Sequence, residues 1–250
     1  MAAEQNRTAS RILRGLRSRY PVFYLVGWDE SRIENLLRSV ARSYFGADDR
    51  LRVWSAASGF GAHEDPAHEA RDPMAAIARV AAAPPEPPLM YLFKDLPPWF
   101  DENPALVRGV RDLYYQLKNG RTVLFMSCPL LRMPEMLKKE IFLVDVDLPS
   151  EEEIVGLLQA DPATAEQPAE ELFQLAARMR GLSMNEAGHL AARLFHGPAL
   201  TGAEMLAEVQ EEKAQMLRKE SCLKFYPSNL SLDQIGGLEN LKQWVTTRAG

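Results

Sequence analysis

Apolar residues along the first 150 positions follow two alternating patterns. Short runs of β-favouring residues at 22–26, 89–93, 122–126 and 141–146 are typical of buried strands, and the alternating run at 51–55 is typical of a strand near a sheet edge. Longer segments with helical spacing lie between these runs. Because strands and helices alternate, the pattern predicts an α/β domain with a mainly parallel five-stranded sheet and flanking helices.

Several predicted helices begin with recognisable start signals. Ser31 and Glu34 have the spacing of a capping box, in which each side chain accepts a backbone N–H from the other residue. Asp72-Pro73 and Asn103-Pro104 place a capping side chain before a proline in the first helical turn. We therefore expect helices to begin near these three points.

The pattern changes after residue 149. Capping boxes at Ser150–Glu153, Ser183–Glu186 and Thr201–Glu204 each predict the start of a helix, and no strand pattern appears among them. Residues 150–221 are therefore expected to form a small helical, lid-like subdomain.

A parallel sheet of this kind prompts a search for a phosphate-binding loop after its first strand. Such a loop needs glycines whose amides surround the phosphates, a lysine, and a serine or threonine for magnesium. The turn here, from Gly27 to Ser31, contains one glycine, no lysine, and the carboxylates of Asp29 and Glu30. Because these carboxylates repel phosphate, the sequence predicts that this domain neither binds nor hydrolyses ATP, and it nominates no catalytic residue.

Other candidate chemistry is weaker. Asp95 ends a predicted strand, the place where P-loop enzymes hold magnesium with an aspartate. The next residue is Leu96 and not a hydrolytic glutamate. Asp95 is therefore either a remnant of such a site or a loop-capping residue. His63 and His68 are five residues apart in a loop, a spacing that does not match the i, i+4 pair of a helical zinc site. His189 and His196 are interpreted as ordinary helix residues. No metal site is predicted.

Composition restricts the choice of partner. The net charge is −5, although residues 1–60 contain ten Lys and Arg against six acids. The acidic remainder argues against nucleic acid as the main partner. The five arginines before Tyr20 are compatible with a basic patch or a transit peptide, but the apolar positions between them favour a solvated face of an amphipathic helix. Two widely separated cysteines indicate a reducing, cytoplasmic location, and no run approaches the roughly 20 apolar residues of a membrane helix.

The end of the chain carries the most specific motif. The segment Asp233-x-Ile235-Gly236-Gly237-Leu238, followed by an amphipathic helix pattern, resembles the opening of an AAA ATPase module. This resemblance implies that Ile235, Gly236 and Gly237 lie along the adenine of ATP, and that the phosphate loop comes after Gly250. The sequence thus resembles a chain that stops before the catalytic half of such a module.

The longer stretch 8–225 is similar to the N-terminal region of AAA ATPases of the cyanobacterial and plastid-encoded type and their bacterial relatives. The matching segments are individually short and occur in the same order. They are 19–26, 54–55, 72–73, 93–95, 110–113, 133–136, 148–149, 152–154, 181–186 and 212–213. The resemblance implies a degenerate P-loop-like domain at 1–149, a helical subdomain at 150–221, and a linker with the start of an AAA module at 222–250.

These observations lead to one main functional hypothesis. The chain is expected to be a non-catalytic N-terminal domain that recruits a protein partner or substrate, or supports assembly of a homo-oligomeric ring, for a downstream module that uses ATP and magnesium. The alternatives are an adaptor for nucleic acid like the inactive subunits of clamp loaders, and a weak, atypical ATPase. The sequence predicts no cofactor for the chain itself and no membrane partner.

Overall fold

The computed structural model describes residues 3–47, 49–61, 69–82, 86–164, 167–198, 200–219 and 236–248. The chain divides into two compact units, residues 1–199 and 200–250. This division does not coincide with the predicted boundaries after 149 and 221. The helices that follow Ser150 belong to the same unit as the sheet, for reasons given with the site.

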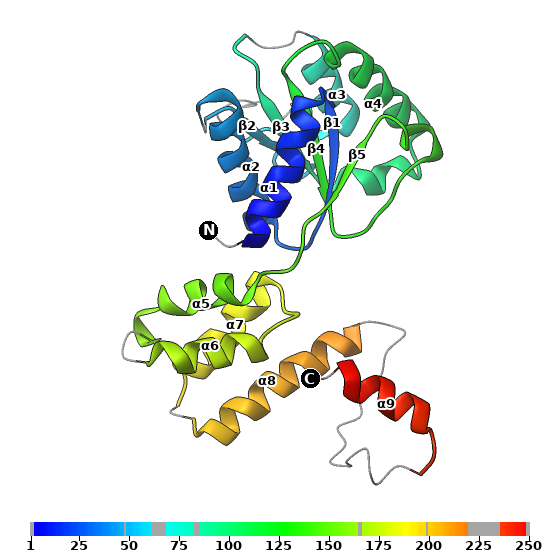
Figure 1. The fold of residues 1–250 in the computed structure, drawn as a ribbon. Coiled ribbons are helices and arrows are strands. Elements are labelled where there is room, and N and C mark those ends of the chain that lie inside the picture. The colour runs from blue at the N-terminus through cyan, green and yellow to red at the C-terminus, as the bar shows by residue number, and fades with distance from the viewer. Residues whose placement is uncertain are drawn as a thin grey trace. The chain divides into compact units, whose positions relative to one another are not determined.

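The first unit is built on a five-stranded parallel sheet (Figure 1). Its strands, in spatial order, are β2 (Leu51–Trp54), β3 (Met90–Lys94), β4 (Val123–Cys128), β1 (Val22–Val26) and β5 (Phe142–Asp145). All five predicted strands are confirmed, with ends within two residues of those expected. The strand at 51–54 lies at a sheet edge, as its alternating pattern predicts.

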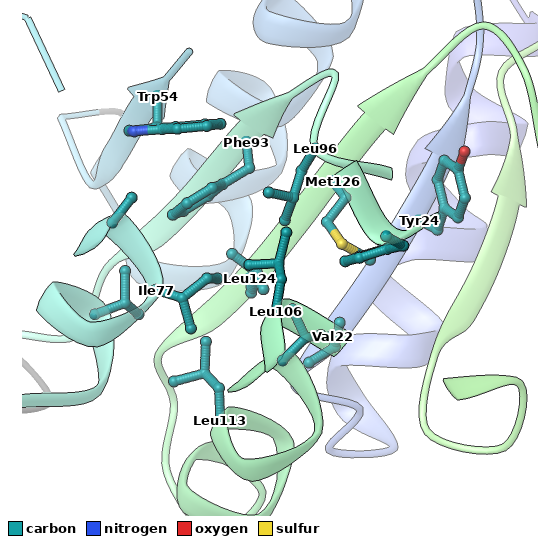
Figure 2. Packing of buried hydrophobic residues seen from close by; sticks show 14 of the residues in the cluster. Val22, Tyr24, Trp54, Ile77, Phe93, Leu96, Leu106, Leu113, Leu124 and Met126 are labelled. Carbon is teal, nitrogen blue, oxygen red and sulfur yellow. The ribbon is translucent and has the colours of Figure 1, made fainter. Parts of the chain in front are cut away.

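Helices cover both faces of this sheet. Helices α1 (Ala3–Arg17) and α2 (Glu30–Phe45) pack on one face, and α3 (Pro73–Ala82) and α4 (Pro104–Leu117) pack on the other. Because strand side chains alternate, neighbouring residues of β1 enter different cores. Figure 2 shows the core beneath α3 and α4, where Trp54 stacks on Phe93 with ring centroids 4.8 Å apart.

Helix α1 resolves the question raised by its arginines. Ile12 and Leu16 are buried, whereas Arg7, Arg14 and Arg17 are exposed. The arginines therefore lie on the solvated face of an amphipathic helix, as the apolar spacing favours.

The capping signals are mostly confirmed. Asp72 accepts a hydrogen bond from the Ala75 N–H at 2.9 Å, and Asn103 accepts one from the Leu106 N–H at 3.0 Å. The capping box predicted at Ser31 is wrong. Helix α2 begins at Glu30 after Asp29, and Glu34 forms an ion pair with a lysine of β3.

The helical part of the first unit contains α5 (Glu151–Gln159), α6 (Ala169–Arg178) and α7 (Met184–Phe195). The capping boxes that begin α5 and α7 are both formed, as predicted. Helix α6 was not predicted, because it follows Pro168 without a side-chain cap. Along the described part of the whole first unit, short 3-10 helices occur at η1 (Glu69–Arg71), η2 (Pro97–Phe100), η3 (Glu135–Leu137) and η4 (Pro162–Thr164).

The second unit contains α8 (Gly202–Lys219) and α9 (Glu239–Arg248). The predicted capping box before α8 is formed: the Thr201 N–H donates to Glu204 at 2.7 Å, and the Glu204 N–H donates to Thr201 Oγ1 at 3.4 Å. Helix α9 confirms the helix predicted after the glycine pair. Among the described helices, none is both long and apolar enough to span a bilayer.

Candidate functional site at the carboxyl edge of the sheet

Ligands of open α/β sheets bind outside the carboxyl ends of the strands, where neighbouring connections leave in different directions. Here that place is the turn after β1, together with the ends of β3 and β4. The Gly27 N–H donates to the Cys128 carbonyl at 3.3 Å, and the Asp95 N–H donates to the Ser127 carbonyl at 2.8 Å. These bonds hold the three segments side by side.

The single glycine of the turn has a packing role. A Cβ added at Gly27 would lie 2.9 Å from Cβ of Val146, closer than side-chain carbons approach one another. Glycine at this position therefore permits the close approach of the segments that follow β1 and β5. Its presence needs no phosphate ligand as an explanation.

Asp29 points into the protein and not toward a ligand. Its side chain is 4% exposed, and its two carboxylate oxygens accept hydrogen bonds from the Met184 N–H at 3.0 Å and the Asn185 N–H at 3.4 Å. These are the first amides of α7. Because a helix N-terminus carries partial positive charge, the Asp29 carboxylate stabilises α7 and attaches it to the turn after β1.

A buried ion pair makes a second attachment. Arg32 of α2 donates to both carboxylate oxygens of Glu153, from Nε at 3.0 Å and from Nη2 at 2.8 Å. It also donates to the Asp147 carbonyl. Both side chains of the pair are 7% exposed. Glu153 additionally accepts the Ser150 N–H in the capping box of α5, so one carboxylate both begins α5 and joins it to α2.

The structure brings a lysine to the site that the sequence did not indicate. The Lys94 ammonium, at the end of β3, lies 3.0 Å from Glu30 and 3.2 Å from Glu34, both on α2. Burial disfavours the charged ammonium, but hydrogen bonds to the two carboxylates outweigh this effect and raise the pKa of Lys94 above its ordinary value. The ammonium is therefore already neutralised by two acids.

Asp95 follows Lys94 in a left-handed backbone conformation, with φ of 51°. Partial burial, and next the negative charge of Glu30, raise the pKa of its carboxyl group. The structure places Asp95 beside the buried thiol of Cys128, which lowers that pKa in part. Among the described residues, no group of three or more His, Cys, Asp or Glu side chains is placed to hold a metal ion.

The groups at this edge do not fit a triphosphate. The first turn of α2 carries the carboxylate of Glu30. The Asp29 carboxylate is hydrogen-bonded to α7, and the Lys94 ammonium forms ion pairs with two acids. A phosphate binding here would meet the negative charge of these carboxylates, and the ammonium that could attract it is already paired.

The remaining candidate residues lie elsewhere. Ile235, His63 and His68 are outside the described residues. Gly236 and Gly237 are separated from the start of α9 by Leu238, and Gly237 has φ of 71°, which suits glycine. Their proposed contact with adenine stays a prediction. His189 is exposed on α7, and His196 at the end of α7 pairs with Asp161 at 2.7 Å.

Three of the four tryptophans are exposed. Trp54 is buried, whereas Trp28, Trp99 and Trp244 are large exposed side chains. Burial of Trp54 is explained by its place on β2. The exposure of the others carries no local sequence signal, because it depends on which neighbours the turns bring together.

Comparison with known proteins places this fold in a family. Residues 8–146 match the family described as SpoVK-like AAA ATPase, N-terminal domain. The AAA domain-containing protein ycf46 of Guillardia theta is 26% identical over 237 residues, which cover 94% of this chain and 46% of the relative. The chain thus spans about half the length of the curated relatives it matches.

Solved structures support the fold assignment. The FIGL-1 AAA domain in complex with ADP aligns with a TM-score of 0.55 at 12% identity, covering 98% of this chain and 88% of that one. Domain III of the Thermotoga maritima replication initiation protein DnaA aligns with a TM-score of 0.53 at 10% identity, covering 84% and 93%. At these identities the likeness concerns the fold alone. With its five-stranded parallel sheet and a family match over more than half its length, the chain belongs to the SpoVK-like AAA ATPase N-terminal domain family.

Proposed function

We propose that residues 8–199 form a domain that does not bind nucleotide and that serves an ATP-hydrolysing module beginning near Asp233. In this proposal the domain recruits a protein partner or substrate, or supports ring assembly, and ATP and magnesium act only in the downstream module. The expected adenine contact of Ile235, Gly236 and Gly237 belongs to that module.

One observation carries the proposal: the place where a P-loop protein would hold phosphate is used for internal attachments. Asp29 accepts a hydrogen bond from the first amide of α7, and Arg32 binds Glu153 at the start of α5. A nucleotide would have to displace these contacts, which join the helical part to the sheet part. The geometry therefore favours a rigid domain over one that opens and closes with ATP.

Titration of ATP and magnesium into the 250-residue chain, followed by calorimetry, tests the proposal. We expect no saturable binding up to millimolar ATP and no release of phosphate. A micromolar dissociation constant that Lys94→Ala weakens would place ATP at this edge and overturn the proposal. The variant Lys118→Ala is a matched control, because Lys118 lies at the far end of α4.

The proposal includes a cytoplasmic location. The buried free thiol of Cys128 supports a reducing compartment. Fractionation of cells that express the tagged full-length protein checks this, and recovery in an oxidising compartment would contradict it.

A further inference from the structure

We propose that the carboxyl edge of the sheet carries a docking surface for a basic, amphipathic peptide segment of a partner protein. The surface consists of Trp28, Trp99, Leu130 and Leu131, and we call it the tryptophan patch. This inference rests on the proposed recruiting function and specifies the chemistry of the partner.

The four side chains are exposed although they are large and apolar. The exposed fractions are 60% for Trp28, 45% for Trp99, 54% for Leu130 and 55% for Leu131. The 3-10 helix η2 illustrates the arrangement, because it buries Pro97 and Phe100 but leaves Trp99 in solvent. Single exposed apolar residues are common, but a group of them at one edge is typical of an interaction surface.

Backbone contacts hold the segments that carry the four residues at one edge of the sheet. Trp28 follows Gly27, whose N–H binds the Cys128 carbonyl, and Leu130 lies two residues after Cys128. The loop after β4 is joined in turn to the segment after η2, because Arg132 pairs with Asp101 at 2.6 Å. Leu131 adjoins Arg132, and Trp99 lies two residues before Asp101.

Part of the tryptophan patch is held in position by hydrogen bonds to the sheet. The Tyr24 hydroxyl donates to the Leu130 carbonyl and accepts the Arg132 N–H at 3.2 Å. The loop that carries Leu130 and Leu131 is therefore attached to β1, which lies inside the sheet between β4 and β5. A partner that binds such a prepared surface loses little free energy to ordering it.

Charge around the patch selects the kind of partner. In the segments that carry the patch, 28–34, 94–102 and 130–132, the charged side chains that are not buried are five acids and two bases: Glu30, Glu34, Asp95, Asp101 and Glu102 with Lys94 and Arg132. Both bases are held in ion pairs with members of the acidic set. Partial burial, and next the negative charge of Glu30, raise the pKa of Asp95, so negative charge is already concentrated here. A segment with Lys or Arg beside its apolar residues would relieve this repulsion, whereas nucleic acid or a second copy would increase it.

A synthetic probe tests this complementarity. The probe is a peptide with leucine and lysine at helical spacing, and the matched peptide has glutamate in place of lysine. Binding to the 250-residue chain is measured by calorimetry at physiological ionic strength, with circular dichroism used to confirm that each variant is folded. Trp28→Ala and Trp99→Ala alter exposed patch residues. Tyr115→Ala is the control, since Tyr115 is 47% exposed near the end of α4 that leads to the opposite sheet edge.

We expect the basic peptide to bind and the acidic peptide to fail. Each tryptophan variant should weaken binding about thirtyfold, as for a central interface aromatic, whereas Tyr115→Ala should leave it unchanged. Glu102→Lys should weaken binding as well. Equal binding of both peptides, an equal effect of Tyr115→Ala, or no binding overturns the proposal. Self-association that Trp28→Ala abolishes overturns it in favour of a second copy.

The two proposals fail in different ways. Loss of peptide binding together with absent ATP binding removes only the docking surface. Micromolar ATP binding to the same sample removes the proposed function, whatever the peptides do.

Discussion

Replacing Arg32 with methionine probes the attachment between α2 and α5. The substitution keeps a long, unbranched side chain but removes the two charged hydrogen bonds to Glu153 and the bond to the Asp147 carbonyl. Glu153, whose side chain is 7% exposed, would then keep its negative charge, with a hydrogen bond from the Ser150 N–H. Breaking one side of a buried pair in this way costs about 3–5 kcal/mol.

A second substitution separates charge from packing. Glu153→Gln removes the buried charge. It retains the capping box of α5, because a glutamine side chain can also accept the Ser150 N–H. In the double variant no unpaired carboxylate remains. We therefore expect the double variant to recover about 2 kcal/mol relative to the sum of the single changes, a coupling within the range of contacting residues.

Urea unfolding of the four proteins by circular dichroism measures these free energies. Hydrogen exchange of the α5 amides reports whether the loss is local. A cost below about 1 kcal/mol for Arg32→Met, with no coupling to Glu153→Gln, would show that the pair is solvated and that the attachment is weaker than the geometry indicates.

Three further predictions follow from neighbouring residues. Asp29→Ala should remove the carboxylate that accepts the first two amides of α7 and destabilise α7 by about 1–2 kcal/mol, seen as faster amide exchange in α7; unchanged exchange would contradict the contact. Gly27→Ala should cost about 1–3 kcal/mol in thermal unfolding because its Cβ would overlap Val146, and an unaltered melting temperature would refute that packing. Burial raises the pKa of Tyr24 from 10.0 to about 12, so its stabilising effect is complete below pH 10 and is lost as the pH rises through about 12. Tyr24→Phe should remove the last phenolate step from an ultraviolet titration, and persistence of that step would assign it to another tyrosine.

Periodicity along the chain predicts most of the fold. The apolar runs identify all five strands of the sheet, and Ser150 and Ser183 identify the starts of α5 and α7. These features are local, because hydrophobic spacing and capping act within a few residues. Helix α6 was not predicted because Pro168 provides no side-chain cap.

The site was predictable only in part. The acidic turn is visible in the sequence, but the partners of its residues are not. Glu153 pairs with Arg32 across 121 positions, and Asp29 reaches Met184 across 155. The capping box predicted at Ser31 failed for the same reason, because Glu34 of α2 forms an ion pair with Lys94 of β3. Long-range pairs of this kind leave no trace in spacing along one helix.

The position of β1 between β4 and β5 has a consequence for biosynthesis. Val22 pairs with Leu124, about 100 residues further along, so the first strand made must wait for a neighbour that is translated much later. At typical elongation rates this delay is about 5–20 s, during which the apolar segment Val22–Val26 has no sheet to join. We expect nascent chains to depend on ribosome-associated chaperones during this interval, and the sheet to close only after β4 has left the exit tunnel.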